Sequence, residues 1–166
     1  MKLDYQFKTR VYNESFLDCN EEISLSVKQS HKLINVLRMK ENDDIIIFNN
    51  ISGEWGAKIK IKKSLIYAEC IKKIRDVKKE NGPSLIFSPL KQARSDWLIE
   101  KATECGVENL FPSLMTRTSV RTINIDRYRS NAIGAAEQTG RLSIPNIEPL
   151  RVYEEQIKIC EKSNKT

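Results

Sequence analysis

Residues 132–141 read Ala-Ile-Gly-Ala-Ala-Glu-Gln-Thr-Gly-Arg. The stretch predicts a helix with a small-residue packing face that ends at Gly140, where a left-handed terminus favours glycine. Helical spacing puts five residues on that face: Tyr128, Ala132, Ala135, Ala136 and Thr139. Because alanine lets another backbone approach closely, this face suits a tightly packed domain or a subunit interface.

Polar side chains gather at the end of this helix. Glu137, Gln138 and Arg141 project from it. A functional cluster fits this arrangement, and so does an ordinary surface helix in which Glu137 pairs with Arg141 four residues later. The spacing leaves both interpretations open.

The composition indicates a globular protein of one domain or two small ones. The chain has 166 residues, of which 40% are hydrophobic and 30% charged, which is ordinary for such proteins. It has no run of about 18 apolar residues, so no membrane span is expected. Residues 1–6 lack an apolar core for export, and we expect a cytoplasmic protein.

Charge and cysteine content narrow the classes of ligand. The formal net charge is +6, which permits nucleic-acid binding without demonstrating it. The four cysteines are scattered singly, and His31 is the one histidine. The sequence therefore predicts reduced thiols and no metal site.

The first half of the chain predicts a small sheet or barrel with one helix. Residues 27–37 have helical spacing, with Ser26 as the cap. An extended opening segment and three apolar runs read as β structure: residues 1–24, 44–48, 54–62 and 65–74. Alternation in the second run leaves a lysine row, Lys58, Lys60 and Lys62, on the outer face. Such a row is commonly a solvated strand face, and alternatively contacts RNA.

The apolar pattern stops over residues 76–83, where we place a domain boundary.

After this boundary, strands and helices alternate along the chain. We expect a strand over 85–88, a helix capped by Ser95 and ended by Gly106, a strand over 107–114 broken by Pro112, and a last helix over 152–160. In the first of these helices, Leu98, Ala102 and Cys105 are predicted to face inward and Asp96, Glu100 and Thr103 outward.

The alternating order predicts a parallel sheet, whose functional sites gather beyond the carboxyl ends of the strands. Lys91 and Arg117 both follow predicted strands at such ends. This placement is the strongest physical indication of a site in the sequence.

Arginine is concentrated near this edge. Five arginines occur over residues 116–141, against Asp126 and Glu137: Arg117, Arg121, Arg127, Arg129 and Arg141. The planar guanidinium binds oxygen atoms in pairs, which suits an anionic backbone or a developing oxyanion. In the first half, His31 and Arg38 lie seven residues apart on nearly the same helix face. His31 is interpreted as a structural or phosphate-contacting residue, with a catalytic base as the alternative.

Several motifs, in order along the chain, resemble the ribosomal RNA small subunit methyltransferase E (RsmE) family of the knotted SPOUT superfamily. Arg10 stands in the opening segment, and Lys91 and Trp97 precede the motif that begins at Lys101. The motifs are His31-Lys-Leu-Ile-Asn-Val-Leu-Arg38, Lys101-Ala-Thr-Glu-Cys-Gly-Val107, Arg117-Thr-Ser-Val120 and Ala135-Ala-Glu-Gln-Thr-Gly-Arg141 with Pro145 beyond. Any one of them is weak, but their order is specific.

The resemblance implies a fold and a division of the chain. It implies an N-terminal PUA-like RNA-binding β-barrel over residues 1–75, a linker over 76–83, and a partial SPOUT α/β methyltransferase domain over 84–166 with a mostly parallel sheet. It also implies a two-fold homodimer.

The implied reaction is methyl transfer from S-adenosylmethionine to N-3 of one uridine in 16S rRNA of the small ribosomal subunit. Arg117 and Arg141 are predicted to hold RNA phosphate or the uracilate oxygens, and Glu137 to orient them or accept the proton. RNA-binding roles are predicted for Arg10, His31, Arg38, Lys58, Lys60, Lys91 and Arg121.

The chain departs from the family pattern after Arg141. The family builds its cofactor site from glycine-rich and apolar loops that form the knot, and nothing after Arg141 resembles them. We therefore expect the cofactor-binding residues beyond Thr166, in a truncated enzyme or in a degenerate relative that binds RNA without catalysis. An assembly protein whose small-residue helix dimerises is a third hypothesis.

Overall fold

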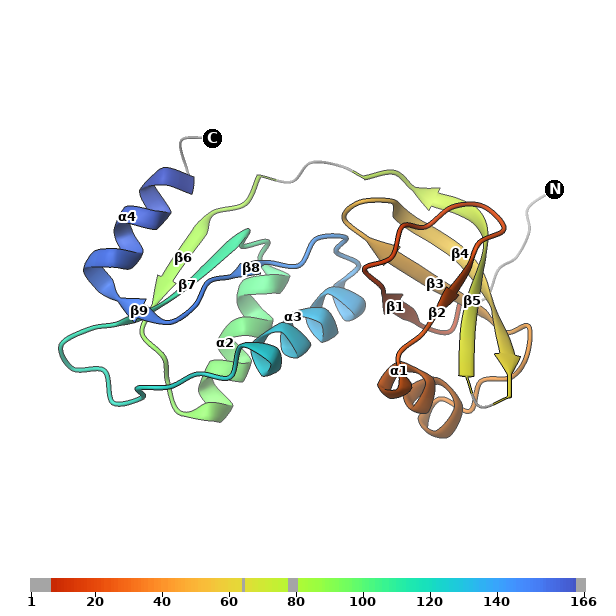
Figure 1. Ribbon diagram of the computed structural model, residues 1–166, viewed down its shortest axis with the longest axis horizontal. Coiled ribbons are helices and arrows are strands. Elements are labelled where there is room, and N and C mark those ends of the chain that lie inside the picture. Colours follow the sequence, from red (N-terminus) through yellow and green to blue (C-terminus); the bar gives the residue numbers. More distant parts are fainter. Residues whose placement is uncertain (1–6, 64, 78–80, 164–166) are drawn as a thin grey trace. The chain divides into compact units, whose positions relative to one another are not determined.

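The structure is a computed structural model that describes residues 7–63, 65–77 and 81–163, with side chains to residue 161. The chain forms two compact units that divide between residues 78 and 79 (Figure 1). The predicted linker over 76–83 stays a prediction, because residues 78–80 lie outside the described part of the chain.

The first unit is a five-stranded, mainly antiparallel sheet with one helical segment. Its elements are β1 (Arg10–Tyr12), β2 (Glu22–Ser24), α1 (Val27–His31), the π-helical turn η1 (Lys32–Val36), β3 (Asp44–Asn49), β4 (Gly53–Lys62) and β5 (Leu65–Arg75). The strand order in this unit is β1-β3-β4-β5-β2. Among the described strands of this unit, only β1 and β3 pair in parallel.

The alternation in β4 orients this sheet as predicted. Trp55, Ala57 and Ile59 are buried in the core of the unit, while the lysine row lies on the other face. Ser26 caps α1 in a reciprocal capping box with Gln29, which satisfies two backbone donors at the helix start. The predicted helix over 27–37 is therefore present, although its second half is π-helical.

The second unit is a parallel sheet with three helices among its described residues. Its elements are β6 (Ser84–Phe87), α2 (Gln92–Glu104), β7 (Asn109–Leu114), α3 (Ile125–Thr139), β8 (Asn146–Ile147), β9 (Arg151–Val152) and α4 (Tyr153–Ser163). Strand β7 is central, with β6 on one side and β8 and β9 in succession on the other. The predicted fold class, a β-rich unit followed by an α/β unit with a parallel sheet, is confirmed.

The start and the buried face of α2 differ from the prediction. The helix begins at Gln92, and Ser95 is not its cap. The Ser95 hydroxyl is buried and both accepts from the Leu90 N–H and donates to the Leu90 carbonyl, each at 3.0 Å. Thr103 is buried, and its hydroxyl is satisfied by donating to the Ile99 carbonyl at 2.8 Å. Cys105 is exposed rather than inward-facing.

Pro112 does not interrupt β7, which was predicted to break there. Pro112 pairs in register with Phe87 of β6, while on the other side β8 pairs up to Leu110 and β9 resumes at Ser113. The proline, which lacks a backbone donor, thus falls where the second ladder is already interrupted.

Helix α3 matches its predicted face and end. Tyr128, Ala132, Ala135 and Ala136 are buried, whereas Thr139 is exposed. Gly140 ends the helix with a φ of 77°, in the left-handed region. In Figure 1 the helix runs back along the sheet, from the loop after β7 toward the start of β8, as a crossover between parallel strands requires.

Candidate functional site

The edge of the parallel sheet where β6 and β7 end, here called the carboxyl edge, carries two loops that are tied together. The hydroxyls of Ser88, after β6, and Thr118, after β7, lie 2.5 Å apart. Thr118 is buried, and its Oγ1 also accepts from the Met115 N–H at 2.8 Å. Its own N–H donates to the Met115 carbonyl at 2.9 Å. The loop after β7, which carries Arg117, is therefore held on the sheet by a hydrogen-bonded turn over residues 115–118.

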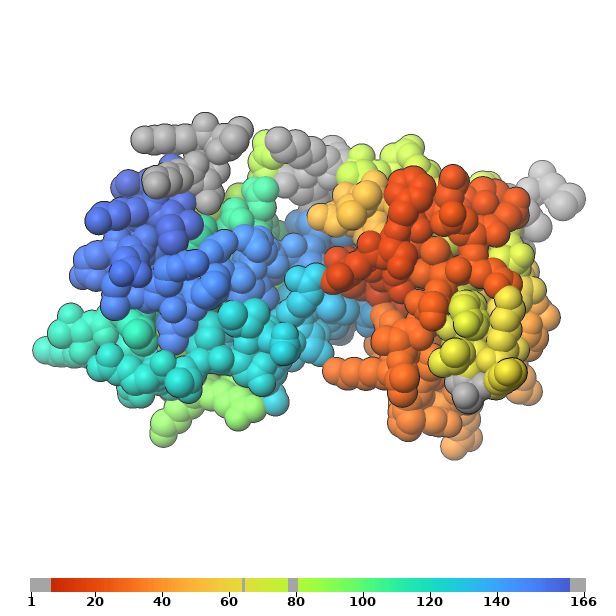
Figure 2. All heavy atoms as spheres, viewed as in Figure 1, coloured from red at the N-terminus to blue at the C-terminus, as the bar shows by residue number. Residues whose placement is uncertain are grey.

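Three exposed cationic residues stand at the carboxyl edge: Lys91, Arg117 and Arg121. Lys91 occupies the N-cap position of α2, directly after the loop that Ser95 anchors through Leu90. Figure 2 shows the segment after β7 on the surface of the second unit. The structure thus places the two predicted strand-end residues, Lys91 and Arg117, on the same edge.

A cavity of about 520 Å³ opens at this edge, a size typical of small-molecule sites. Apolar side chains form one part of its wall, and polar groups of Thr116, Arg121 and Glu154 form the rest. The lining residues are Leu114, Met115, Thr116, Arg121, Val152, Tyr153 and Glu154. Residues 152–154 were not predicted to contribute to a site, because strand β9 has only two residues and gives no periodic signal.

Glu137 and Arg141 lie at the opposite edge of the same sheet. The Arg141 guanidinium packs against the backbone of Gly106, which precedes β7, and Arg141 Nη2 donates to Ser143 Oγ at 3.5 Å. The six residues of β7 span about 20 Å. The structure therefore does not bring Arg141 or Glu137 to Arg117 within one unit.

Arg127, in the first turn of α3, is held in an ion pair with α2. Arg127 forms a bidentate pair with Asp96, with Nε 2.9 Å from Oδ1 and 3.1 Å from Oδ2. Asn131 donates to the same carboxylate at 2.7 Å. Hydrogen bonding by Arg127 holds the pKa of Asp96 below its ordinary value. This cluster joins α2 to α3 and leaves Arg127 with a structural role.

In the first unit, Arg10 is nearly buried. Its Nε donates to Glu54 Oε1 at 2.8 Å, and its guanidinium carbon lies 4.0 Å from the centroid of the Phe48 ring. Arg75 contacts the other oxygen of the same carboxylate at 3.1 Å. These contacts hold the sheet together, so RNA binding by Arg10 stays a prediction that the geometry does not favour.

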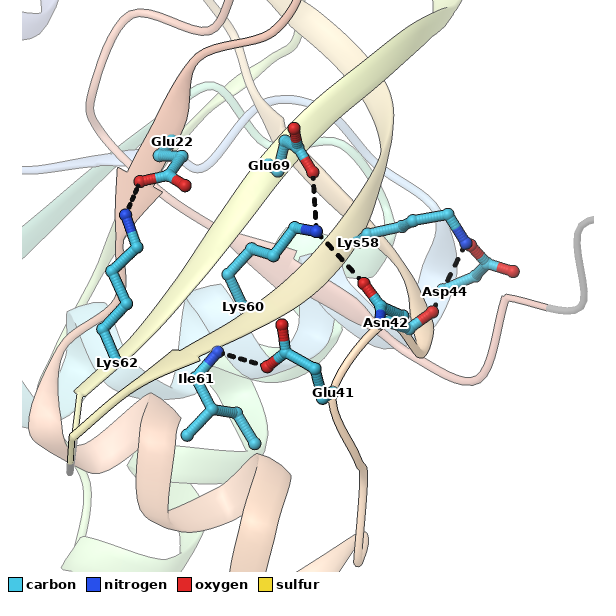
Figure 3. Close-up of polar contacts among 9 residues, drawn as sticks. All are labelled: Glu22, Glu41, Asn42, Asp44, Lys58, Lys60, Ile61, Lys62 and Glu69. Atoms are coloured by element: carbon cyan, nitrogen blue, oxygen red, sulfur yellow. Dashed lines mark hydrogen bonds and ion pairs between the residues drawn. The ribbon is translucent and has the colours of Figure 1, made fainter.

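The lysine row is matched by carboxylates from three other strands of the sheet, β2, β3 and β5 (Figure 3). Lys58 Nζ lies 3.1 Å from Asp44 Oδ1, and Lys60 Nζ lies 3.2 Å from Glu69 Oε2. Lys62 pairs with Glu22, which raises the pKa of Lys62. Because each ammonium has an acidic neighbour, this face carries little of the positive charge predicted for RNA contact by Lys58 and Lys60.

His31 and Arg38 are both exposed. His31 lines a second cavity, of about 420 Å³, in the first unit. Arg38 follows η1 with a φ of 52°. Among the described residues, no three His, Cys, Asp or Glu side chains are grouped so that they could hold a metal ion. No helix in the described part of the chain is long and apolar enough to cross a membrane.

Comparisons with known proteins agree on one family. An RNA methyltransferase domain matches residues 79–166, and an RNA methyltransferase PUA domain matches residues 27–69. The chain is 30% identical to ribosomal RNA small subunit methyltransferase E of Rickettsia conorii over 151 residues, covering 90% of this chain and 62% of that protein. The same enzyme of Buchnera aphidicola from Acyrthosiphon pisum is 34% identical over 155 residues, covering 87% and 60%.

Solved structures share the fold. Ribosomal RNA small subunit methyltransferase E of Neisseria gonorrhoeae, bound to S-adenosyl methionine, superposes with a TM-score of 0.76 at 24% identity, covering 89% of this chain and 63% of that one. A methyltransferase of Legionella pneumophila in complex with the same cofactor gives 0.72 at 24% identity, covering 86% and 63%. The chain thus spans less than two thirds of the length of these relatives.

Proposed function

The chain belongs to the RNA methyltransferase family that includes the ribosomal RNA small subunit methyltransferases E, and from this premise we propose that it serves S-adenosylmethionine-dependent methylation of small-subunit rRNA. The proposed target is N-3 of a uridine in 16S rRNA. The proposed partners are this rRNA and a second copy of the chain.

The carboxyl edge is the observation that carries the proposal. Two strand-end loops are joined by the Ser88–Thr118 hydrogen bond. The edge carries the exposed side chains of Lys91, Arg117 and Arg121, and Arg121 also lines an open cavity. Cationic side chains bind phosphate oxygens and stabilise negative charge that develops on a substrate.

The chemistry of the cavity fits part of a nucleoside cofactor. Leu114, Val152 and Tyr153 provide an apolar wall for a purine ring, and Thr116 and Glu154 provide oxygen atoms for ribose hydroxyls or an ammonium group. S-adenosylmethionine, when bound, supplies a methyl group on a positively charged sulfur.

The proposed role of Arg117 follows from the substrate. The N-3 imide must lose its proton before it accepts a methyl group, and the negative charge then spreads onto the two flanking carbonyl oxygens. We propose that Arg117 holds these oxygens or the adjacent phosphate, with Arg121 and Lys91 on the RNA backbone. Glu137 and Arg141 lie beyond the other end of β7, so we assign them no contact with Arg117 in the same unit.

Salt-dependent binding to a 16S rRNA fragment tests the substrate role. Arg117→Ala and Arg121→Ala are each expected to weaken binding and to lower the slope of log K against log salt by about 0.7–0.9. Lys101→Ala is the matched control, because Lys101 lies in the last turn of α2 and pairs with Glu104. An equal loss with all three variants would contradict the role of the carboxyl edge.

Methyl incorporation tests the reaction itself. Labelled S-adenosylmethionine and small ribosomal subunits are incubated with the protein, and the modified position is mapped by reverse transcription, which N-3 methylation blocks because it removes a Watson–Crick donor. We expect one stop at a uridine. Methylation at another position contradicts the proposed target, and rRNA binding without binding of the cofactor supports the non-catalytic alternative.

A further inference from the structure

A groove lies between the helical segment α1–η1 and the turn of the β4–β5 hairpin in the first unit (Figure 1). It has a volume of about 420 Å³, within the range of sites that hold a small molecule. One wall is helical, and the other belongs to the hairpin. The lining residues are Val27, Ser30, His31, Ile34, Asn35, Ile61, Lys63, Leu65 and Ile66. We call this feature the α1 groove.

Aliphatic side chains form most of the α1 groove. Ile66 is buried in the first core, and Ile34 packs against that core, so the inner part of the groove is continuous with it. At the rim, Val27 is 78% exposed, and Ile61 and Leu65 are 41% and 43% exposed. Covering such groups with an apolar chain removes them from water, which favours binding. The groove therefore suits a ligand with an aliphatic part.

Ser30 is a second, independent observation at the helical wall. The residue is 8% exposed, and its Oγ is identified, among the described residues, as a buried side-chain polar atom without a hydrogen-bond partner. Buried polar atoms are almost always hydrogen-bonded in folded proteins, so an unpaired one marks a position where a partner is missing. A hydroxyl can donate to an acceptor, and a ligand oxygen at this wall supplies one.

Lys63 indicates the charge of that ligand. Its side chain lines the groove and forms no ion pair with any residue the structure describes, whereas the lysine row on the other face of β4 is paired with carboxylates (Figure 3). None of the described lining residues is acidic. Glu41, which accepts from the Ile61 N–H at 2.6 Å, is not among them. The polar end of the ligand is therefore expected to be an anion.

We propose that the α1 groove binds a small aliphatic carboxylate. Its chain lies against the aliphatic wall, and its carboxylate accepts from Ser30 Oγ and pairs with Lys63. A carboxylate has two acceptor oxygens, so it can serve a hydroxyl and an ammonium group together. An uncharged ligand leaves the ammonium without a counter-charge. The proposal concerns the first unit and does not depend on methyl transfer at the carboxyl edge, which belongs to the second unit.

Calorimetric titration of the full chain tests the chemical class of the ligand. The probes are butanoate, hexanoate and octanoate below the concentration at which they form micelles, with 1-octanol as the uncharged match of the longest. Each added methylene is expected to tighten binding by about two- to fourfold, as burial of one methylene does. Octanol is expected to bind at least about fivefold more weakly than octanoate, because it lacks the charge-assisted contact.

Two substitutions test the polar end of the site. Ser30→Ala removes an unpaired buried hydroxyl, so it is expected to leave the urea midpoint unchanged or slightly higher while weakening octanoate binding by about fivefold. Lys63→Ala is expected to weaken octanoate by about fivefold and to leave octanol unaffected. Lys58→Ala is the matched control, because its ammonium pairs with Asp44, and it is expected to bind octanoate like the parent.

Nuclear magnetic resonance with the ¹⁵N-labelled full chain locates the site without relying on variants. Octanoate is expected to shift backbone amide signals of residues 27–35, 61–63 and 65–66. Shifts spread over both units, equal binding of octanol and octanoate, or octanoate binding unchanged by Ser30→Ala and Lys63→Ala would overturn the proposal. So would the absence of carboxylate binding. A short peptide with an apolar carboxyl-terminal residue that bound more than tenfold tighter than octanoate would assign the groove to a protein chain end instead.

Discussion

At the scale of single residues, Arg10 shows how a cation can be used for folding rather than for binding. Its side chain is 13% exposed and that of Glu54 is 9% exposed, and the guanidinium covers the Phe48 ring. A carboxylate this deeply buried is stable only when it is paired. Arg10 therefore serves as an ionic partner for the Glu54 side chain at the edge of the first core.

We expect Arg10→Ala to lower the free energy of unfolding by about 2–4 kcal/mol, because it leaves the Glu54 carboxylate with Arg75 as its remaining ionic partner. Urea unfolding measures this change. Lys101→Ala removes an exposed cation that pairs with Glu104 three residues later and is expected to cost less than about 0.5 kcal/mol. If Arg10→Ala weakened RNA binding without reducing stability, the residue would be a ligand for RNA instead.

The thiols form a second prediction at this scale. Burial raises the pKa of Cys70 to about 12, whereas Cys19 and Cys105 are exposed. At pH 8 a thiol with that pKa is roughly one part in ten thousand thiolate, which is the reactive form. Iodoacetamide labelling followed by peptide mass spectrometry should modify Cys19 and Cys105 first. Labelling of Cys70 at a comparable rate in the folded protein would contradict its burial.

At the scale of elements, the Asp96–Arg127–Asn131 cluster joins the two helices that cover the sheet of the second unit. The pKa of Asp96 is lowered in the folded state, so the pair stabilises the fold above the unfolded pKa of about 3.9. This stabilisation is lost as the pH falls through the lower, folded pKa.

Asp96→Asn is therefore expected to lower the melting temperature at pH 7 and to melt increasingly like the parent protein as the pH drops below about 4. Thermal melts over a pH series measure the difference. Asp76→Asn is the control, because the Asp76 carboxylate is 86% exposed, and it should show a much smaller pH-dependent difference. A difference that persisted unchanged at low pH would mean that packing, not charge, explains the effect.

The same helices show what the sequence could and could not predict. The glycine end and alanine face of α3 follow from local spacing, and so does the placement of Lys91 and Arg117 after parallel strands. The burial of Thr103 depends on one hydrogen bond to Ile99, which polarity alone does not reveal. Ion pairs such as Arg10–Glu54 join residues 44 positions apart, so no sequence window contains them.

Separation of the predicted catalytic residues has a similar cause. Arg117 and Arg141 are close in the sequence, but α3 runs between them. Its 15 residues cover about 22 Å, from the carboxyl edge back to the start of the next strand. A sequence motif gives only the order of residues along the chain. The crossover through α3 places Arg117 and Arg141 at opposite edges of the sheet.

At the scale of the whole molecule, the net charge of +6 is unevenly compensated. Carboxylates pair with the lysine row and with Arg10, while Arg117 and Arg121 are exposed at the carboxyl edge. Exposed positive charge is therefore concentrated at this edge rather than spread evenly over the surface. Such a concentration raises the local concentration of anions.

Each unit also has its own hydrophobic core, since the buried clusters draw on residues 11–70 and 85–147 separately. Trp55 is buried in the first core and Trp97 is 62% exposed in the second unit. A Trp97→Phe variant therefore has one tryptophan, whose fluorescence reports the first unit, while α2, α3 and α4 dominate the far-ultraviolet circular dichroism. We expect urea to give non-coincident transitions by the two probes.

Arg10→Ala in this background should move the fluorescence midpoint to lower urea and leave the circular dichroism midpoint nearly unchanged, because its lost contacts all belong to the first unit. Ser95→Ala should do the reverse, since Ser95 fixes the Leu90 backbone in the second unit, at a cost of about 1–3 kcal/mol. Coincident transitions that shift together with either substitution would show instead that the two units unfold as one cooperative structure.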